Sequence, residues 1–309
     1  PKITTKMKTP TIAVLFVLLP GSLFLKAHTI PFQLIEKSIV FEAAVDGTRG
    51  YFILDTGSSH LILDDQYVQG RPTEEKLRGI TGREIDVHRV SVDIFLGDLE
   101  LKRTEALTLS LAHLSHRKGV PIIGLMGIQP LWNYELTIDF ERCVLELKTI
   151  EKNRNEERSV KRPDASFGFS WKGGIPVIEM GVGDEMVHFG FDTGATINVL
   201  DSRKAKELSG LLNEEAEAKS RLIGVAGSNQ TVPVRQLQQV IIEKYLCPEI
   251  SVAVMPLAGW KSRVAKMKAI DGLLGYDFIR HFRTTINFKR RTIYLDHRDG
   301  SAKPVIVAR

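Results

Sequence analysis

The sequence predicts an all-β protein made of two related, barrel-like lobes with few short helices. Three observations lead to this class. Apolar, strand-like segments alternate with Gly-rich turns along most of the chain. The tripeptide Asp-Thr-Gly occurs twice, at Asp55 and at Asp192, each time behind an apolar run. Further matched segments follow both copies in the same order, which indicates an internal duplication.

The N-terminal residues 1–27 are expected to form a signal peptide. They contain four lysines and no acidic residue, and residues 11–25 form an apolar run. A run of this length is shorter than the roughly 20 residues that span a bilayer. Cleavage predicts an exported protein, periplasmic or secreted, with no stable membrane span, whereas an uncleaved leader would leave a membrane anchor.

Beyond the leader, we expect an N-terminal lobe at 28–150, a linker at 151–165 and a C-terminal lobe at 166–309. The linker is charged and has little apolar content. Without the leader, 38 basic residues face 37 acidic ones, so the charge gives no reason to expect nucleic acid as a partner. Two cysteines do not make a disulfide scaffold, and we expect Cys143 and Cys247 to be buried and free.

Each lobe is expected to open with a β-hairpin that leads to its Asp. In the first lobe, a strand over 39–45 ends at Asp46-Gly47, which is typical of a hairpin turn, and the chain returns to Asp55. In the second lobe, a strand over 175–182 turns at Gly183-Asp184 and returns to Asp192. Both hairpins have the same spacing to the Asp that follows.

The segments after each Asp-Thr-Gly also match. A short strand ends in an Asp at 61–64 and again at 198–201, and Asp201 is expected to cap a helix over 204–218. Each lobe closes with Gly-apolar-apolar-Gly, at 124–127 and 272–275, and then with a helical turn and a final strand.

Two Gly-bracketed segments lie between these matched regions. Alone, such a segment indicates a plain β-turn, but its recurrence at a similar distance past each Asp-Thr-Gly favours a mobile hairpin tip that contacts substrate. The residues concerned are Gly79, Ile80, Thr81 and Gly82 in the first lobe, and Gly224, Val225, Ala226 and Gly227 in the second.

The two Asp residues predict a specific chemistry if they lie close together. Adjacent carboxylates cannot both ionise cheaply, so one pKa rises and the pair holds a single proton. One Asp can then take a proton from water while the other polarises a carbonyl, which hydrolyses an amide without a metal. Residues expected to support the pair are Thr56, Gly57, Ser58, Thr193, Gly194 and Ala195.

Taken together, these residues resemble the aspartic peptidases of the pepsin and retropepsin type. The resemblance rests on two Asp-Thr-Gly motifs, the two closing Gly segments and the Gly-rich tips, and it covers about 35–296. It implies two acid-protease-type lobes related by a pseudo-twofold axis, with Asp55 and Asp192 as the catalytic pair and the tips as flaps. Both lobes keep a candidate flap, whereas the pepsin type keeps one, so a single-chain retropepsin-like pseudo-dimer is expected. Neither tip contains the Tyr of a pepsin-like flap, which argues against pepsin-like kinetics.

The predicted function is therefore an aspartic endopeptidase that acts as a monomer on peptide or protein substrates, with no cofactor and no metal. A Ser58 hydroxyl bonded to a carboxylate would lower the pKa of the pair, so we expect a moderately acidic pH optimum. The alternative is a catalytically silent protein of the same fold that binds peptides. Two other patterns are expected to have no catalytic or metal-binding role. His60 is expected to be a strand residue and not the base of a serine nucleophile, and His113 and His116 are expected to lie in a polar loop and not in a metal site.

Overall fold

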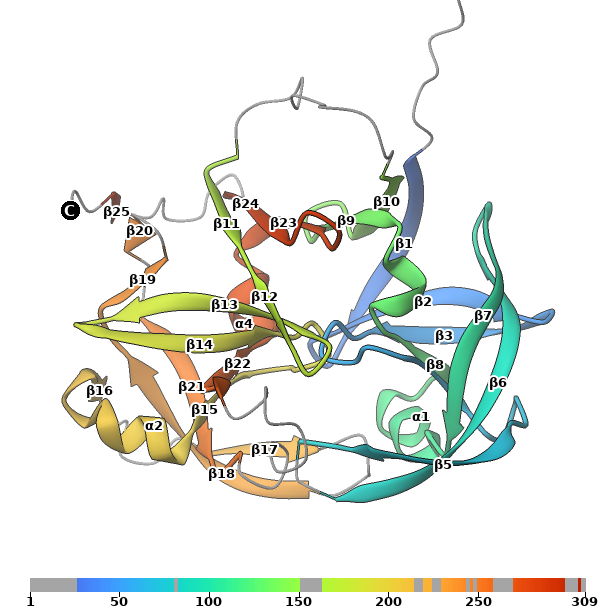
Figure 1. Cartoon of the computed structure of the whole chain (residues 1–309), viewed down its shortest axis with the longest axis horizontal. Helices are drawn as coiled ribbons and strands as arrows, with labels where there is room; N and C mark the ends of the chain where they lie inside the picture. Colours follow the sequence, from blue (N-terminus) through green and yellow to red (C-terminus); the bar gives the residue numbers. More distant parts are fainter. Residues whose placement is uncertain are drawn as a thin grey trace, which may run out of the picture.

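In a computed structural model, the protein is built mainly of β-strands, in two lobes that flank a shared central sheet (Figure 1). The expected all-β class with few short helices is confirmed. Across the part of the chain that is described, no helix is both long and apolar enough to span a membrane. The structure describes residues 27–80, 83–150, 163–213, 219–223, 229–242, 245–246, 249–257, 269–297 and 305–306.

The first lobe comprises strands β1 to β10 with the short helices α1 and η1. The expected leader lies outside the described residues except for Ala27, which begins the first strand. The elements are β1 (Ala27–Ile35), β2 (Ser38–Val45), β3 (Thr48–Leu54), β4 (Leu61–Asp64), β5 (Arg71–Arg78), β6 (Glu84–Leu96), β7 (Leu99–Leu109), α1 (Ala112–Lys118), β8 (Ile122–Met126), η1 (Gln129–Leu131), β9 (Tyr134–Asp139) and β10 (Val144–Thr149).

The second lobe follows the expected linker, of which residues 151–162 lie outside the described residues. Its elements are β11 (Ala165–Gly168), β12 (Ser170–Lys172), β13 (Ile175–Val182), β14 (Glu185–Phe191), β15 (Asn198–Asp201), α2 (Ser202–Glu207), η2 (Ser209–Leu211), β16 (Leu212–Asn213), β17 (Lys219–Ile223), β18 (Asn229–Leu237), β19 (Val240–Ile242), β20 (Tyr245–Leu246), β21 (Ile250–Met255), β22 (Gly272–Leu274), α4 (Tyr276–Ile279), β23 (Phe282–Asn287), β24 (Thr292–His297) and β25 (Val305–Ile306).

The same set of strand pairings occurs in both lobes. In the first lobe, β3 runs parallel to β8, β8 is antiparallel to β4, and β4 is parallel to β7. In the second lobe, β14, β22, β15 and β21 repeat these three pairings with the same directions. Each Asp-Thr-Gly therefore follows a strand, β3 or β14, that lies beside the closing Gly segment of its own lobe.

Hairpin turns and close packing explain several matched residues. Asp46 and Gly47 both have positive φ, 45° and 89°, as a two-residue turn between β2 and β3 requires. A Cβ atom on Gly124 would lie 2.2 Å from the Phe52 ring, and one on Gly272 would lie 2.6 Å from the Phe189 ring. The first glycine of each closing segment thus makes room for an aromatic ring of the neighbouring strand.

The lobes are joined by a sheet to which both contribute, in the order β11-β24-β23-β9-β10-β1 (Figure 1). Strands β9 and β23 meet in antiparallel register at its centre, with Thr137 opposite Thr285. The hydroxyls of these two threonines are 2.9 Å apart and buried. At a nearby edge, Lys37 of the first lobe makes a 2.8 Å ion pair with Asp277 of α4.

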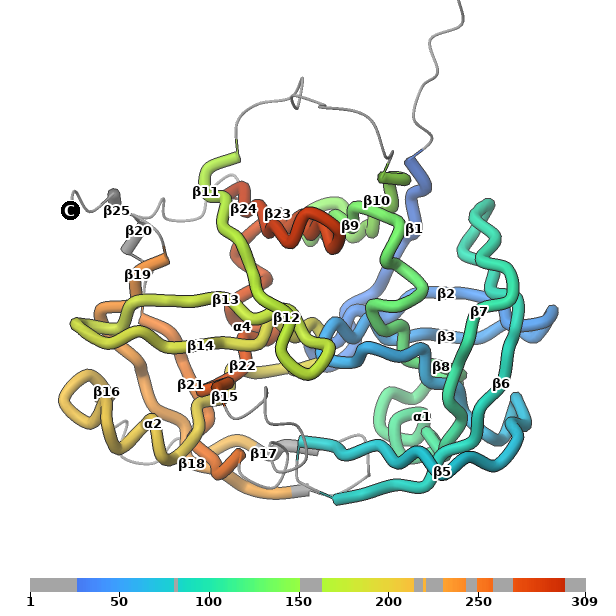
Figure 2. Tube along the Cα trace, in the orientation of Figure 1, coloured from blue at the N-terminus to red at the C-terminus, as the bar shows by residue number. Residues whose placement is uncertain are grey.

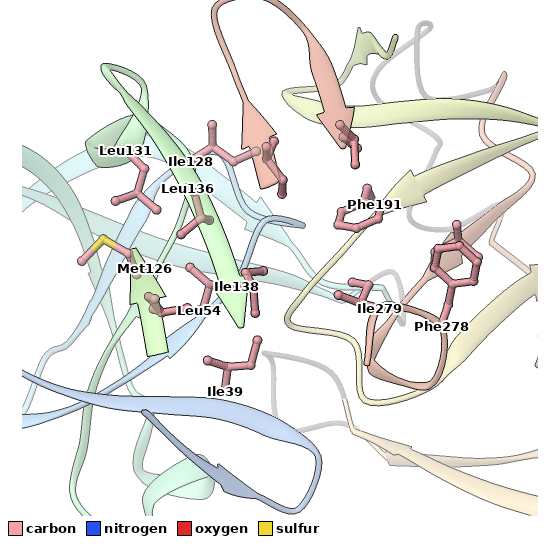
Figure 3. Packing of buried hydrophobic residues seen from close by; sticks show 14 of the residues in the cluster. Ile39, Leu54, Met126, Ile128, Leu131, Leu136, Ile138, Phe191, Phe278 and Ile279 are labelled. Carbon is pink, nitrogen blue, oxygen red and sulfur yellow. The ribbon is translucent and has the colours of Figure 1, made fainter. Parts of the chain in front are cut away.

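The hydrophobic core runs continuously from one lobe into the other. Leu54, Met126 and Ile138 from the first lobe and Phe191 and Ile279 from the second belong to one cluster of buried side chains (Figure 3). The last three residues of β3 and of β14 are buried, so these ends, 52–54 and 189–191, are continuously apolar and do not alternate. The core therefore fixes how the ends of these two strands approach each other.

The helices are shorter than expected. Asp201 does cap α2, with its carboxylate accepting a 2.9 Å hydrogen bond from the Arg203 amide. The expectation of a helix over 204–218 is wrong, because α2 ends at Glu207 and β16 begins at Leu212. Ser209-Gly210 follows the last turn, and these residues favour a helix end over a helix interior.

Candidate active site

Two loops, each beginning with an Asp, meet where the lobes come together. Asp55 follows β3, and its amide donates a 2.9 Å hydrogen bond to the Met126 carbonyl at the end of β8. Asp192 follows β14, and its amide donates an equivalent 2.9 Å bond to the Leu274 carbonyl at the end of β22. The closing Gly segment of each lobe thus holds the start of that lobe's Asp loop.

Thr56 and Thr193 link the two loops by a reciprocal set of hydrogen bonds. The Thr56 amide donates to the Thr193 hydroxyl at 2.9 Å, and the Thr193 amide donates to the Thr56 hydroxyl at 3.0 Å. Each hydroxyl then donates across the interface, to the Phe191 carbonyl at 2.8 Å and to the Leu54 carbonyl at 3.0 Å. Both threonines are buried, so this arrangement fixes the separation of the loops.

The carboxyl groups of Asp55 and Asp192 lie close together, each against the glycine of the opposite loop, and the charge of Asp192 raises the pKa of Asp55. Backbone amides support each of them. The Gly57 amide donates to Asp55 Oδ1 at 3.0 Å, and the amides of Gly194 and Ala195 donate to Asp192 Oδ1 at 2.9 and 3.2 Å. The structure therefore brings the two sequence-predicted Asp residues together.

Glycine is required after each Thr because the opposite carboxyl lies against the backbone. A Cβ atom on Gly57 would lie 2.4 Å from Cγ of Asp192, and one on Gly194 would lie 2.5 Å from Oδ1 of Asp55. These distances are far below any van der Waals contact, and the atoms met belong to the site itself. Each glycine of one lobe thus makes room for the Asp of the other.

Both Asp pKa values are raised. Burial raises the pKa of Asp55 well above its ordinary value, and the charge and hydrogen bond of Asp192 raise it further. Burial also raises the pKa of Asp192, where backbone amides from Gly194 and Ala195 act in the opposite direction. The carboxyl groups are desolvated although both residues keep partial exposure. The pair is therefore arranged to hold one proton.

Ser58 does not play the part expected from the sequence. Its hydroxyl donates to the His60 carbonyl at 3.0 Å and accepts from the His60 amide at 3.3 Å. The pKa of Asp55 is instead lowered by two backbone amides, first that of Gly57 and then that of Ser58. The expected hydroxyl bond from Ser58 to a carboxylate is thus replaced by a local turn.

The second glycine of each closing segment packs against its Asp loop. A Cβ atom on Gly127 would lie 2.1 Å from the His60 carbonyl, and one on Gly275 would lie 2.4 Å from the Ala195 carbonyl. Asn198, which sequence reasoning missed, adds a buried link in the second lobe. Its side chain accepts from the Gly275 amide at 2.8 Å and donates to the Ser251 carbonyl at 3.0 Å. A polar residue in an otherwise apolar strand was the signal that could have identified it.

The predicted flap segments lie at the ends of two hairpins, β5–β6 and β17–β18, on the same side of the molecule (Figure 2). Gly79 is described, and its amide donates to the Arg83 carbonyl at 3.2 Å. Ile80 packs against a buried cluster of the second lobe that includes Val199 and Leu273. The remaining flap residues, Thr81, Gly82, Gly224, Val225, Ala226 and Gly227, lie outside the described residues.

Other candidate residues are placed away from this site. His113 and His116 lie on α1, and not in a loop as expected. Within the described residues, no group of three His, Cys, Asp or Glu side chains is arranged to hold a metal ion. Cys143 is free and, contrary to expectation, only partly buried, while Cys247 lies outside the described residues.

Comparison with known proteins agrees with the geometry. A crystal structure of aspartic proteinase from Irpex lacteus superposes with a TM-score of 0.50 at 12% identity, covering 89% of this chain and 98% of that one. The chain has the aspartic peptidase fold. A family model described as aspartyl protease also matches residues 178–278, which span β14, Asp192 and β22. No curated protein matched in a sequence search.

The expected resemblance to aspartic peptidases is therefore confirmed. The family match lies within the second lobe, whereas the aspartic peptidase fold extends over both. Together they support a protease-type, hydrolytic function for the chain.

Proposed function

We propose that the chain is an aspartic endopeptidase in which Asp55 and Asp192 activate a water molecule for peptide hydrolysis. The observation that carries this proposal is the close approach of two desolvated carboxyl groups, one from each lobe, on loops that the Thr56–Thr193 bonds hold together. A pair so arranged retains one proton over a wide pH range, which supplies an acid and a base at the same place.

The unequal environments of the two carboxyls suggest their roles. Asp192 accepts hydrogen bonds from two backbone amides, which favour its ionised form, so it acts as the general base toward water. Asp55 accepts one such bond, from the Gly57 amide, so in this proposal it holds the shared proton, which it donates to the carbonyl oxygen of the substrate. The resulting tetrahedral diol then collapses: the C–N bond breaks as the proton on Asp192 passes to the leaving nitrogen, and one diol hydroxyl returns its proton to Asp55 as the new C=O bond forms, which restores the pair.

The substrate in this proposal is an extended peptide lying between the Asp loops and the two flap hairpins. The hairpins β5–β6 and β17–β18 lie on one side of the molecule (Figure 1). One chain supplies both Asp residues, so we propose that it acts as a monomer. We also propose export of the chain through residues 1–27, which fractionation of cells carrying the full and leader-deleted chains would test.

The first experiment is cleavage of a peptide library by the purified protein. Asp55→Asn and Asp192→Asn are each expected to lower kcat by at least about 100-fold, because each variant removes one half of the acid–base pair. Asp184→Asn, in the exposed turn between β13 and β14, serves as a matched control and should leave cleavage unchanged. Equal cleavage by all three variants would overturn the proposed mechanism, and binding without cleavage by the wild type would indicate a silent peptide-binding protein.

A further inference from the structure

His60 lies between the loop that begins at Asp55 and the flap hairpin of the first lobe. Its Nδ1 is 3.0 Å from the Ser59 hydroxyl, and its Nε2 is 3.7 Å from Oε1 of Glu75 on β5. The other oxygen of Glu75 accepts a hydrogen bond from Arg89 on β6. One continuous chain of polar contacts thus connects the Asp loop to both strands of the β5–β6 hairpin.

A bulge in β5 places Glu75 in this chain. Pro72 lies opposite His88 and Lys76 lies opposite Asp86, so the three residues between Pro72 and Lys76 face a single residue of β6. The Glu75 amide donates to the Thr73 hydroxyl within the bulge at 3.3 Å. Bulges of this kind redirect a side chain and are common next to active sites.

The contact is only partly exposed to water. The side chains of His60 and Glu75 are each 30% exposed, and His60 is backed by the close approach of its carbonyl to Gly127. Partial burial reduces screening by solvent and salt, so this contact contributes more than a fully exposed pair would.

We propose that His60 is a positioning residue that attaches the β5–β6 hairpin to the Asp55 loop through Glu75 and Arg89. This inference rests on the proposed peptidase function only for its effect on catalysis, since the attachment itself is a property of the fold. The position of the β5–β6 hairpin then depends on the loop that contains Asp55.

Among the described residues of the second lobe, the position equivalent to His60 carries an apolar side chain. Ile197 stands 137 residues after His60, the spacing that separates Asp192 from Asp55, and it packs against an apolar cluster that includes Val232 and Met255. Ile197 therefore makes apolar contacts near β18, whereas His60 makes polar contacts that lead to β5 and β6. This difference provides an internal reference for any measurement on the first hairpin.

Opposing effects act on the charge of the His60 ring. Burial lowers the pKa of His60, Glu75 raises it and Arg89 lowers it, and these are the charged groups that face the ring from β5 and β6. The Glu75 contact thus favours the protonated ring, with which it forms an ion pair, whereas burial disfavours the charge.

Hydrogen–deuterium exchange of the full chain, analysed by mass spectrometry, tests the attachment without using peptidase activity. His60→Ala and Glu75→Gln should each speed exchange in 71–78 and 84–96 by about three- to fivefold at neutral pH, relative to 229–237. The double variant should exchange no faster than the more severe single variant. Glu74→Gln, an exposed substitution on the same strand, should leave exchange unchanged.

A conservative variant separates positioning from simple packing. His60→Gln retains groups that can bond to Ser59 and Glu75, so it should restore most of the protection at neutral pH. Additive effects in the double variant, or a His60→Gln variant as fast as His60→Ala, would overturn the proposal, and neither outcome depends on whether the protein cleaves peptides.

Discussion

At the scale of single residues, the two Gly-to-carboxyl contacts are the tightest constraint on the Asp pair. Gly57→Ala places a methyl group within 2.4 Å of Asp192 Cγ, so the lobes must shift or the carboxyl must rotate away. We expect kcat to fall by at least about 100-fold, because a displacement of about 1 Å at a reacting group has an effect of this size. Cleavage of the peptide identified for the wild type measures it.

Gly47→Ala gives no steric clash in the β2–β3 turn and is the control for this substitution. It should destabilise the protein modestly because of the positive φ at Gly47 but should leave kcat unchanged. If Gly57→Ala retained wild-type kcat, the described approach of the two loops would be incorrect.

The raised pKa values of the Asp pair also predict how stability depends on pH. A carboxyl whose pKa is higher in the folded state stabilises the protein at low pH, and this contribution is lost as the pH rises through the folded value. Asp55→Asn removes the cost of ionising a buried group. We expect this variant to raise Tm by a few degrees near pH 7 and to have little effect near pH 4.

Thermal unfolding followed by circular dichroism at both pH values tests this expectation. Asp184→Asn should leave Tm within a degree or so at either pH, because that side chain is exposed. A Tm for Asp55→Asn that is lower at pH 7 than that of the wild type would contradict the direction of the shift given for Asp55.

At the scale of elements, the closing Gly segment of the second lobe, 272–275, depends on the buried side chain of Asn198. Asn198→Ala leaves the Gly275 amide and the Ser251 carbonyl without their partner. Each unsatisfied buried group costs about 1–3 kcal/mol, so we expect the free energy of unfolding to fall by roughly 2–4 kcal/mol. Urea denaturation measures it, and the exposed Asn133→Ala should change it by less than about 0.5 kcal/mol.

Most elements were predictable because each has a local signal. Continuous apolar runs marked β3 and β14, and Asp46-Gly47 marked a turn whose φ values are now described. The helix after Asp201 was predicted too long because apolar spacing over 204–218 suggested a helix, whereas Leu212 pairs with Leu237 in a sheet. Tertiary strand pairing overrode a local preference there.

The site was predictable only in part. Repetition identified Asp55, Asp192 and their neighbours, because both lobes carry the same motif. It gave no signal for His60, whose counterpart in the second lobe is Ile197, or for the use of the Ser58 hydroxyl on the His60 backbone. Features that occur in one lobe alone depend on contacts between strands far apart in the sequence.

At the scale of the whole molecule, the two lobes form one cooperative unit. Strands β9 and β23 share a sheet, the core is continuous, and Arg283 pairs with Glu146 across the interface at 2.9 Å. A specific protease site inserted within 151–162 and then cut should therefore leave the two fragments associated. Size-exclusion chromatography is expected to show a single species of the intact mass, and separate elution of the fragments would contradict a shared core.

The exchange of hydrogen bonds between Thr56 and Thr193 has a consequence for how the protein is made. The Leu54 carbonyl and the Thr56 amide find their partners only on a segment that is synthesised 137 residues later. While the ribosome is still translating the second half, the first half carries one acid and no completed site. A nascent chain is thus inert toward its neighbours until its last strands emerge, so any proteolytic power arises only after synthesis is nearly finished.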